Sequence, residues 1–537
     1  MSPNREHVVD WQRLLPLLLI VLGVTVYANS FTGAFLLDDY RGIVENPGIR
    51  SFRTCMAGTT RPLAALSFCL NYAIGGLKVA DYHLVNLAIH LMAGLALFGV
   101  VRRTMWLPRC ADKYGRVAAP FAAVVAALWL VHPLQTESVT YISQRSESLM
   151  GLFYLLTIYG FVRGATSAHG RLWCAAAAAA CACGMASKPV MVTAPLTLWL
   201  YDVCFLSGSS REAWRRRWRV HLGLAATWLL WAVLVSLPNE SSESAGFGVT
   251  TVSPVEYART QPAVILHYLR LSFWPDPLCF NYGWPPASSA ASAALPAAGL
   301  VALIVLTGVA CVRCPPFGFC ALSFWVVLAP SSSVVPVADL AVEHRMYLPL
   351  AALSVLAAGG VYGVGERLRA RLSMAPDTGR WASSAIAVAV IAALSALTIG
   401  RNTVYQSGVA IWQDVIRTRP DNHRACVSLA SELLDRQHYA EAAAVCTDLL
   451  SRTPDFRRTA PADIPQDIAN GADMKLYVEA RFYAIAHNYL GVARARQGSL
   501  PEAVAHFREA LRLMPQFADA RRNLTRALQE SGRGSQR

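Results

Sequence analysis

The feature that most constrains this chain is a series of apolar blocks, each long enough or nearly long enough to cross a lipid bilayer. A helix needs about 20 residues to span the hydrocarbon core. The blocks cover residues 14–28, 84–101, 117–131, 149–162, 172–186, 190–206, 220–237, 295–312, 317–335, 346–364 and 382–399. They explain why only 15% of the residues are charged, against about a quarter in soluble domains. We therefore expect an all-α, polytopic bundle of about eleven transmembrane helices.

The apolar blocks stop near residue 400, and charged residues become frequent from residue 401 onward. This change predicts a membrane domain over residues 1–400 and a soluble domain over residues 401–537. The first block lacks a small-x-small cleavage site before Asn29 and Phe31, so we interpret it as a retained anchor rather than a signal peptide.

The net charge of +14 is concentrated in short loops between the blocks, which argues against nucleic-acid binding. The basic groups are Arg102, Arg103, Arg109, Lys113 and Arg116; Arg211, Arg215, Arg216, Arg217 and Arg219; and Arg367, Arg369, Arg371 and Arg380. Loops poorer in Lys and Arg alternate with them, as the positive-inside rule requires. We expect an inner-membrane protein with a cytoplasmic N-terminus. An odd number of spans then places the C-terminal domain in the periplasm.

The soluble domain contains tetratricopeptide (TPR) repeats. Residues 484–517 fit the 34-residue template, with Leu490 and Gly491 at the small-packing positions of the first helix. A weaker repeat is predicted near 422–455, with an insertion over about 456–482. Stacked helix pairs form a groove that usually binds peptides or proteins, although such a domain can also act only as a scaffold.

Two adjacent acids, Asp38 and Asp39, directly follow the first apolar block. Adjacent side chains cannot both point the same way. One can therefore act as a base while the other positions it or helps to hold a cation. The alternative is a helix N-cap beside a solvated acid. The same loop contains Arg61 and then an apolar stretch too short to span, which we expect to lie in the membrane interface.

A second dense group of polar residues runs from His132 to Glu147 and includes Glu137 and Arg145. Ionisable residues at a membrane border are costly and are functional candidates. Glu137 and Arg145 either form an ion pair between helices, or Arg145 binds a phosphate, whose oxygens match a guanidinium.

Two further cationic candidates stand at the ends of predicted spans. Lys188 can reach either lipid head groups or a ligand phosphate. Arg345 lies near the expected head-group plane beside Glu343 and His344, and it is the strongest single candidate for a phosphate ligand.

The motifs, taken in order, resemble those of the transmembrane-and-TPR protein O-mannosyltransferases, whose bacterial relatives share this layout. They read DDY…NP, RPLAALSFCLNYAIGGL, YHLVNLAIHL, HPLQTESVTYISQRSESL, ASKPVMVTAPLTLWLYD and EHRMYLPL, followed by the repeats. The resemblance implies a membrane glycosyltransferase of the GT-C type. In that family the last motif is more often Glu-Arg-x-x-Tyr, so His344 is a departure from the pattern.

The resemblance also implies the reaction and the roles of the residues. A sugar, typically mannose, would pass from a polyprenyl-phosphate donor to a Ser or Thr hydroxyl of an exported protein bound by the repeats. Asp38, Asp39 and Glu137 would be catalytic, and Arg345, Arg145 and Lys188 would bind the donor phosphate. Arg61, His132, Glu343 and His344 would support them. No metal-binding motif is evident, and a divalent cation is the one candidate cofactor beside the lipid-linked sugar.

Two alternatives stay open at this point. The chain could be a membrane-anchored TPR scaffold for envelope assembly, without enzymatic activity. It could also be a GT-C enzyme that modifies a glycolipid rather than a protein.

Overall fold

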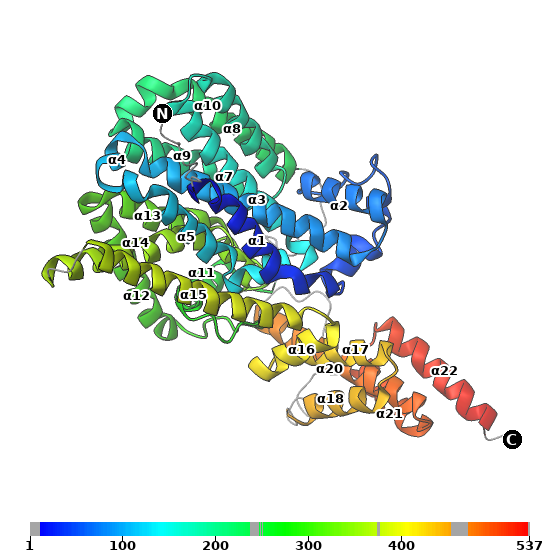
Figure 1. The fold of residues 1–537 in the computed structure, drawn as a ribbon. Helices are drawn as coiled ribbons and strands as arrows, with labels where there is room; N and C mark the ends of the chain where they lie inside the picture. Colours follow the sequence, from blue (N-terminus) through cyan, green and yellow to red (C-terminus); the bar gives the residue numbers. More distant parts are fainter. Residues whose placement is uncertain are drawn as a thin grey trace, which may run out of the picture.

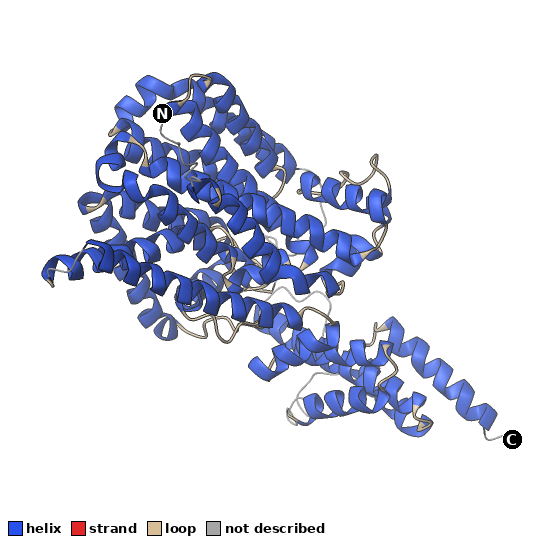
Figure 2. Cartoon of the chain, in the orientation of Figure 1, coloured by secondary structure: helices blue, strands red, loops and turns tan. Residues whose placement is uncertain are grey.

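The computed structural model describes residues 11–236, 246, 249, 251–372, 376–452 and 471–534. Its regular structure is helical over these ranges (Figure 2). The fold is therefore all-α, as predicted. A large helical bundle holds the N-terminal three quarters of the chain, and a smaller helical array extends from one side of it (Figure 1).

The bundle is built from helices α1 to α15. They are α1 Leu15–Tyr27, α2 Pro62–Gly75, α3 Val79–Met105, α4 Pro108–Tyr114, α5 Ala118–Leu130, α6 Thr136–Val139, α7 Arg145–Thr166, α8 Gly170–Met185, α9 Ala194–Tyr201, α10 Ser210–Ser236, α11 Pro254–Phe273, α12 Ala290–Arg313, α13 Pro315–Leu328, α14 Pro349–Arg371 and α15 Pro376–Val404.

Eight helices in the described part of the chain are long and apolar enough to cross a membrane, or nine if the bent pair formed by residues 108–130 and 133–139 is one span. The chain is thus a multi-pass membrane protein. Eleven spans would also require the shorter apolar helices Gly170–Met185 and Pro315–Ser331 to cross, and that number stays a prediction.

Small residues let the central helices approach closely. A Cβ on Gly94 of α3 would lie 2.6 Å from the Leu130 side chain of α5. A Cβ on Gly160 of α7 would lie 3.2 Å from backbone atoms of Ala177 in α8. Small residues are favoured at such interfaces because helices in lipid associate by close packing. By contrast, only 6% of the most apolar window of α12, and likewise of α15, is buried, so these two helices face lipid.

Two polar segments between the long apolar helices are folded and largely buried. Residues 132–147 form short helical turns around α6, and most of their side chains are inaccessible to solvent. The segment before α12 contains α11, whose start has a capping box between Ser253 and Glu256. The polar residues of both segments therefore form buried hydrogen bonds instead of facing solvent.

The C-terminal array consists of α16 Gly408–Thr418, α17 His423–Asp435, α18 Tyr439–Ser451, α20 Gly471–Arg496, α21 Leu500–Leu513 and α22 Ala518–Gly534. The proposed boundary at residue 400 falls in the last turns of α15. Successive helices pack as antiparallel pairs, and most of the predicted insertion over 456–482 lies outside the described residues. In the second pair, the Phe507 ring packs directly against Gly491. A Cβ at residue 491 would lie 2.6 Å from this ring, which explains why the residue is a glycine.

The array is docked on the bundle rather than tethered to it. Trp412 and Val415 of α16 belong to the same apolar core as the membrane helices. The ring of Phe280, from the segment after α11, lies 5.7 Å from Trp412 and 5.0 Å from Tyr141. The first helices of the array therefore cover the end of the bundle at which the polar segments gather.

Candidate active site

The two adjacent acids of the first loop have different environments. Asp39 is fully buried, whereas Asp38 is exposed. Asp39 Oδ2 accepts a hydrogen bond from the Leu36 amide at 2.9 Å. Its Oδ1 accepts one from the Ser143 amide at 2.7 Å and another from the Ser143 hydroxyl. Asp39 therefore anchors the loop, and Asp38 offers the accessible carboxylate.

The backbone just before Asp38 is strained. Leu37 has φ of +40°, in the left-handed region that residues with a Cβ rarely adopt. The Asp38 amide donates a hydrogen bond to the Tyr141 hydroxyl at 2.9 Å. Strain of this kind persists only where surrounding contacts hold it, and it is typical of functional sites. Tyr141 and Ser143 were not singled out from the sequence, and their place in the buried 132–147 segment is the signal that could have found them.

Burial changes the acidity of the anchoring acid. It raises the pKa of Asp39 to about 7, and the hydrogen bonds from Ser143 and Leu36 only partly offset this effect. Burial disfavours the charged form of a carboxyl, whereas donors stabilise it. Asp39 therefore changes protonation state near neutral pH.

Positive charge converges beside the first loop. Lys188 forms an ion pair with Glu147, and their side chains are 13% and 3% exposed. Burial lowers the pKa of Lys188, and Glu147 opposes this shift. The charges of Arg61 and Arg345 lower the Lys188 pKa further. A group of cations with so few acidic partners is suited to an anion such as a phosphate.

Arg61 links this positive group to the acidic loop. It precedes α2 and donates a long hydrogen bond of 3.5 Å to the Ser146 hydroxyl. Burial lowers the pKa of Arg61, and the carboxylates of Glu147 and Asp38 oppose that effect. The open carboxylate of Asp38 and the cations therefore belong to one site.

A carboxylate and an imidazole form the other wall. Glu137 accepts hydrogen bonds from both the backbone amide and Nδ1 of His344, each at 2.8 Å. Burial and the charge of Lys188 lower the pKa of His344 well below its usual range, so its ring is neutral at pH 7. With its proton on Nδ1, the ring has an acceptor at Nε2. Glu343 is buried behind it and accepts from the Cys279 amide at 2.6 Å and the Tyr282 hydroxyl at 2.8 Å.

The two arginines favoured as phosphate ligands have most of their donors engaged within the protein. Arg145 is fully buried and donates to Asn86 Oδ1 at 2.6 Å and to the Tyr82 carbonyl at 3.0 Å. Its Nη1 donates to the Ser67 carbonyl of α2 at 3.2 Å. Arg145 thereby fastens α2 to α3.

Arg345 has a similar environment. It donates to the Tyr257 hydroxyl and the Leu340 carbonyl, both at 3.1 Å, and to the Asp339 carbonyl at 2.6 Å. Tyr257 lies on α11, a helix outside the apolar blocks of the sequence. Arg345 holds the 339–345 segment and contributes positive charge from behind the site.

His132 supports the bend between α5 and α6. Its Nδ1 accepts from the Leu134 amide at 3.2 Å, so its Nε2–H donates to the Ser272 carbonyl at 3.1 Å. The ring is buried and ties the bend to the end of α11. Across the described residues, no group of three or more His, Cys, Asp or Glu side chains is arranged to hold a metal ion.

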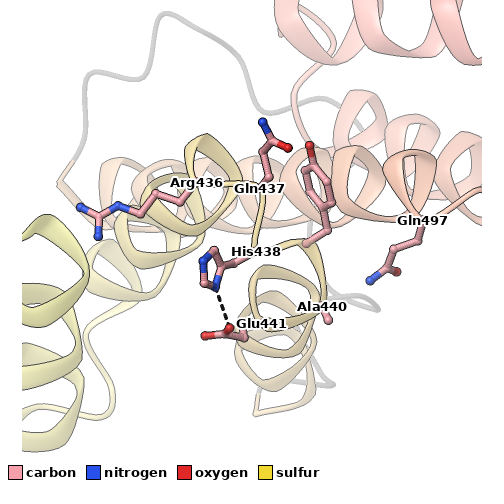
Figure 3. Close-up of a pocket in the computed structure, with 7 residues that line it drawn as sticks. Arg436, Gln437, His438, Ala440, Glu441 and Gln497 are labelled. Atoms are coloured by element: carbon pink, nitrogen blue, oxygen red, sulfur yellow. Dashed lines mark hydrogen bonds and ion pairs between the residues drawn. The ribbon is translucent and has the colours of Figure 1, made fainter.

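A shallow pocket lies on the docked array at the turn between α17 and α18 (Figure 3). Its lining is Arg436, Gln437, His438, Tyr439, Ala440, Glu441 and Gln497. Gln437 has φ of +64°, and His438 Nδ1 lies 2.8 Å from Glu441 Oε1. Gln497 comes from the turn between α20 and α21, so the pocket joins the two repeats.

Comparisons with known proteins agree with this architecture. Residues 484–517 match the family model of the tetratricopeptide repeat, which confirms the predicted repeat at those residues. The chain is similar to protein O-mannosyl-transferase Tmtc2 of Drosophila melanogaster, with 31% identity over 291 residues, 49% of this chain and 30% of the relative. It is also similar to Tmtc1 of the same organism (29% over 306 residues, 50% and 34%) and to human TMTC2 (30% over 203 residues, 34% and 23%).

These relatives confirm the resemblance to the transmembrane-and-TPR O-mannosyltransferases, but the chain spans only about a third of their length or less. Among solved structures, the crystal structure of ArnT from Cupriavidus metallidurans bound to undecaprenyl phosphate aligns with 89% of this chain and 85% of that chain. The identity is 16% and the TM-score 0.39, values too low to establish a common fold.

Proposed function

We propose that this chain is a membrane glycosyltransferase of the GT-C type. It transfers a sugar, mannose by resemblance, from a polyprenyl-phosphate donor to Ser or Thr hydroxyls of exported proteins. The observation that carries the proposal is the open carboxylate of Asp38 beside the half-buried cations Arg61 and Lys188 at one end of a membrane bundle. The similarity to protein O-mannosyl-transferases supports the same reaction.

The chemistry assigns a role to each side of the site. Asp38 takes the proton from the acceptor hydroxyl as its oxygen bonds to the anomeric carbon. The bond from that carbon to the phosphate oxygen breaks, and the polyprenyl phosphate leaves with the electron pair. Lys188 and Arg61 stabilise the negative charge on the departing phosphate. A single displacement of this kind inverts the anomeric centre.

The remaining residues hold these groups in place. Asp39 anchors the loop of Asp38, and Glu147 orients Lys188. Glu137 fixes the His344 ring, whose Nε2 can accept a hydroxyl of the sugar or of the acceptor. Arg145 and Arg345 act through the segments that they fasten, together with the positive charge that they supply.

We place the protein in the inner membrane, with its N-terminus in the cytoplasm and its repeats in the periplasm. The polar site and the docked repeats share one end of the bundle, since the Ala34 amide donates to the Tyr405 carbonyl at 3.3 Å. The basic ends of α3 and α7, at Arg103 and Arg163, lie at the other end of those helices. The positive-inside rule assigns that basic end to the cytoplasm.

The repeats would present the acceptor chain. Burial raises the pKa of Tyr40, next to the acidic pair, and the charge of Glu432 from α17 raises it further. Helix α17 therefore lies close to the loop of Asp38. The turn that follows α17 forms the pocket of Figure 3. An extended peptide held by the pocket could reach the carboxylate.

The test is sugar transfer by the purified chain in lipid nanodiscs, with polyprenyl-phosphate mannose and a Ser/Thr-rich peptide as substrates. We expect Asp38→Asn to lower the rate by about 10²–10⁴-fold, the usual contribution of a general base. Asp112→Asn, at an exposed acid on α4, is the matched control and should retain the rate. Lys188→Met should lose activity, and Lys188→Arg should recover part of it.

Peptide mass gives the readout, and the products separate the alternatives. A sugar transferred to lipid rather than to peptide would support a glycolipid-modifying enzyme. If no sugar is transferred and the repeats on an unrelated anchor restore the function of a deletion strain, the chain is a scaffold.

A further inference from the structure

A buried arginine connects the docked array to the last membrane helix. Arg401, in the last turn of α15, donates to Asp414 of α16 at 2.5 Å. Each of the two side chains is only 8% exposed. The second oxygen of Asp414 accepts from Arg417, whose side chain is 80% exposed. Removing one partner of a buried ion pair is costly, so the pair fixes α16 against the end of α15.

The two remaining nitrogens of the Arg401 guanidinium indicate that it has a second partner. Its Nε and Nη2 are buried, and neither has a hydrogen-bond partner among the described residues. Glu343 Oε2 is also buried and has no hydrogen-bond partner among the described residues. Unsatisfied buried polar atoms are rare and require an explanation. Here a donor and an acceptor of opposite charge are both left over.

The charge of Arg401 also acts on Glu343. Burial raises the pKa of Glu343, and the positive charge of Arg401 is the largest effect that opposes it. A buried carboxylate needs such a counter-charge. A bridging water can complete a contact between charged groups that do not touch directly.

Glu343 leads directly into the candidate active site. It begins the turn Glu343–Met346, and the next residue is His344, which Glu137 holds through two hydrogen bonds. A shift of Glu343 would therefore move the imidazole and its carboxylate partner.

We propose that Arg401 is a positioning residue that couples the docking of the repeat array to the Glu137–His344 pair, with Asp414 on one side and Glu343 on the other. The proposal rests on the proposed function for its catalytic consequence, but the coupling itself is a property of the fold. It makes α16 part of the catalytic unit, so that the site is ordered only when the array is docked.

The central test breaks the link on the array side. Asp414→Asn keeps the shape of the side chain and removes its charge. We expect the kcat for sugar transfer to fall about tenfold, with the acceptor KM changed less than twofold, because positioning affects turnover rather than binding. Arg424→Gln is the matched control, since Arg424 forms an exposed ion pair with Asp339 between the same two parts at 3.5 Å. Arg417→Gln controls for the other contact of Asp414.

A double-mutant cycle tests the other side. Glu343→Gln should lower kcat by itself, and adding Asp414→Asn should cause little further loss, because both substitutions break one chain of interactions. Fully additive losses would overturn the proposal. A kcat for Asp414→Asn equal to that of Arg424→Gln would overturn it as well.

A second readout does not depend on activity. The His344 amide, which donates to Glu137, should exchange its hydrogen faster in Asp414→Asn than in the wild type. Its exchange rate should be unchanged in Arg424→Gln. If the wild type transfers no sugar but this difference appears, the proposed function fails and the coupling stands. Equal exchange in all variants would overturn the coupling.

Discussion

At the scale of single residues, the site separates two acids that are neighbours in sequence. Asp39 is buried under three donors, and Asp38 is exposed beside a strained Leu37. Sequence reasoning could say that one acid acts and the other positions it, but it could not say which. In the proposed function Asp38 is the base, because only an accessible carboxylate can meet an acceptor hydroxyl.

The raised pKa of Asp39 predicts a pH dependence. Protonation removes the charge that holds the Leu36 and Ser143 donors, so we expect transfer to decrease as the pH falls through about 7. The stability contribution has the opposite direction. A carboxyl whose pKa is raised by folding favours the folded state at low pH, and this contribution is lost as the pH rises towards 7. A pH–rate profile and thermal unfolding across pH 5–9 measure both, and a flat rate from pH 8 to 6 would contradict the assignment.

The buried pair of Lys188 and Glu147 predicts a dissociation between stability and activity. Glu147→Gln leaves an ammonium without its partner and should destabilise the protein by about 3–5 kcal/mol. Adding Lys188→Met should restore much of that stability, because both charges are then gone. Thermal unfolding in detergent measures the recovery of stability. The transfer assay should show no recovery of activity in the double variant. Activity in the double variant would exclude Lys188 as the phosphate ligand.

At the scale of elements, α2 is a short helix attached to its neighbours by a few polar contacts, among them those of Leu63 with Ala186, Asn71 with Asp81 and Ser67 with Arg145. It lies at the edge of the bundle (Figure 1), with Leu70 and Ile74 46% and 84% exposed. These exposed apolar side chains agree with the predicted position in the membrane interface. Its main polar attachment is Arg145, and its first residue follows Arg61, so the position of α2 sets the position of that cation.

Arg145→Lys is therefore expected to loosen α2. A lysine has one ammonium and cannot reproduce the three-sided contact of the guanidinium with Asn86, Tyr82 and Ser67. We expect faster proteolysis of residues 51–60 and a several-fold higher KM for the lipid donor. Arg50→Lys is the control, because Arg50 is exposed and only faces the Tyr72 ring of α2 at 5.8 Å. Equal proteolysis in both variants would contradict the role of Arg145.

At the scale of the whole molecule, the repeat array is packed into the same body as the membrane helices. Apolar packing through Trp412 is reinforced by Asn422, which donates to the Asn281 carbonyl at 2.8 Å. The Arg419 guanidinium lies 5.4 Å from the centre of the Tyr282 ring. These contacts hold the 279–284 segment, which in turn donates to Glu343.

Truncation distinguishes a docked array from a tethered one. A chain ending at Arg452 retains α16 to α18, and we expect it to stay monodisperse in detergent with its membrane domain folded. A chain ending at Val404 exposes Phe280 and the apolar surface under Trp412, so it should aggregate or unfold at a lower temperature. Size-exclusion chromatography and thermal unfolding give the comparison. Equal behaviour of the two chains would mean that the array is only tethered.

The sequence by itself determined the class of the fold and the identity of most candidate residues. Apolar blocks near 20 residues predict membrane helices wherever they occur, because the bilayer sets the length. The 34-residue template identified the repeat at 484–517, because its small and aromatic positions are fixed by the packing of one helix pair. Both signals are local, so they can be read along the chain.

Only the tertiary structure decided which candidate residues are accessible and which are engaged in internal contacts. It engaged most donors of Arg145 and Arg345 inside the protein, left Lys188 partly accessible, and brought Tyr141, Ser143 and Arg401 to the site. These outcomes depend on which polar groups meet after the helices pack. Hydrogen bonds between residues far apart in the chain, such as Asp39 and Ser143, leave no periodic mark in the sequence.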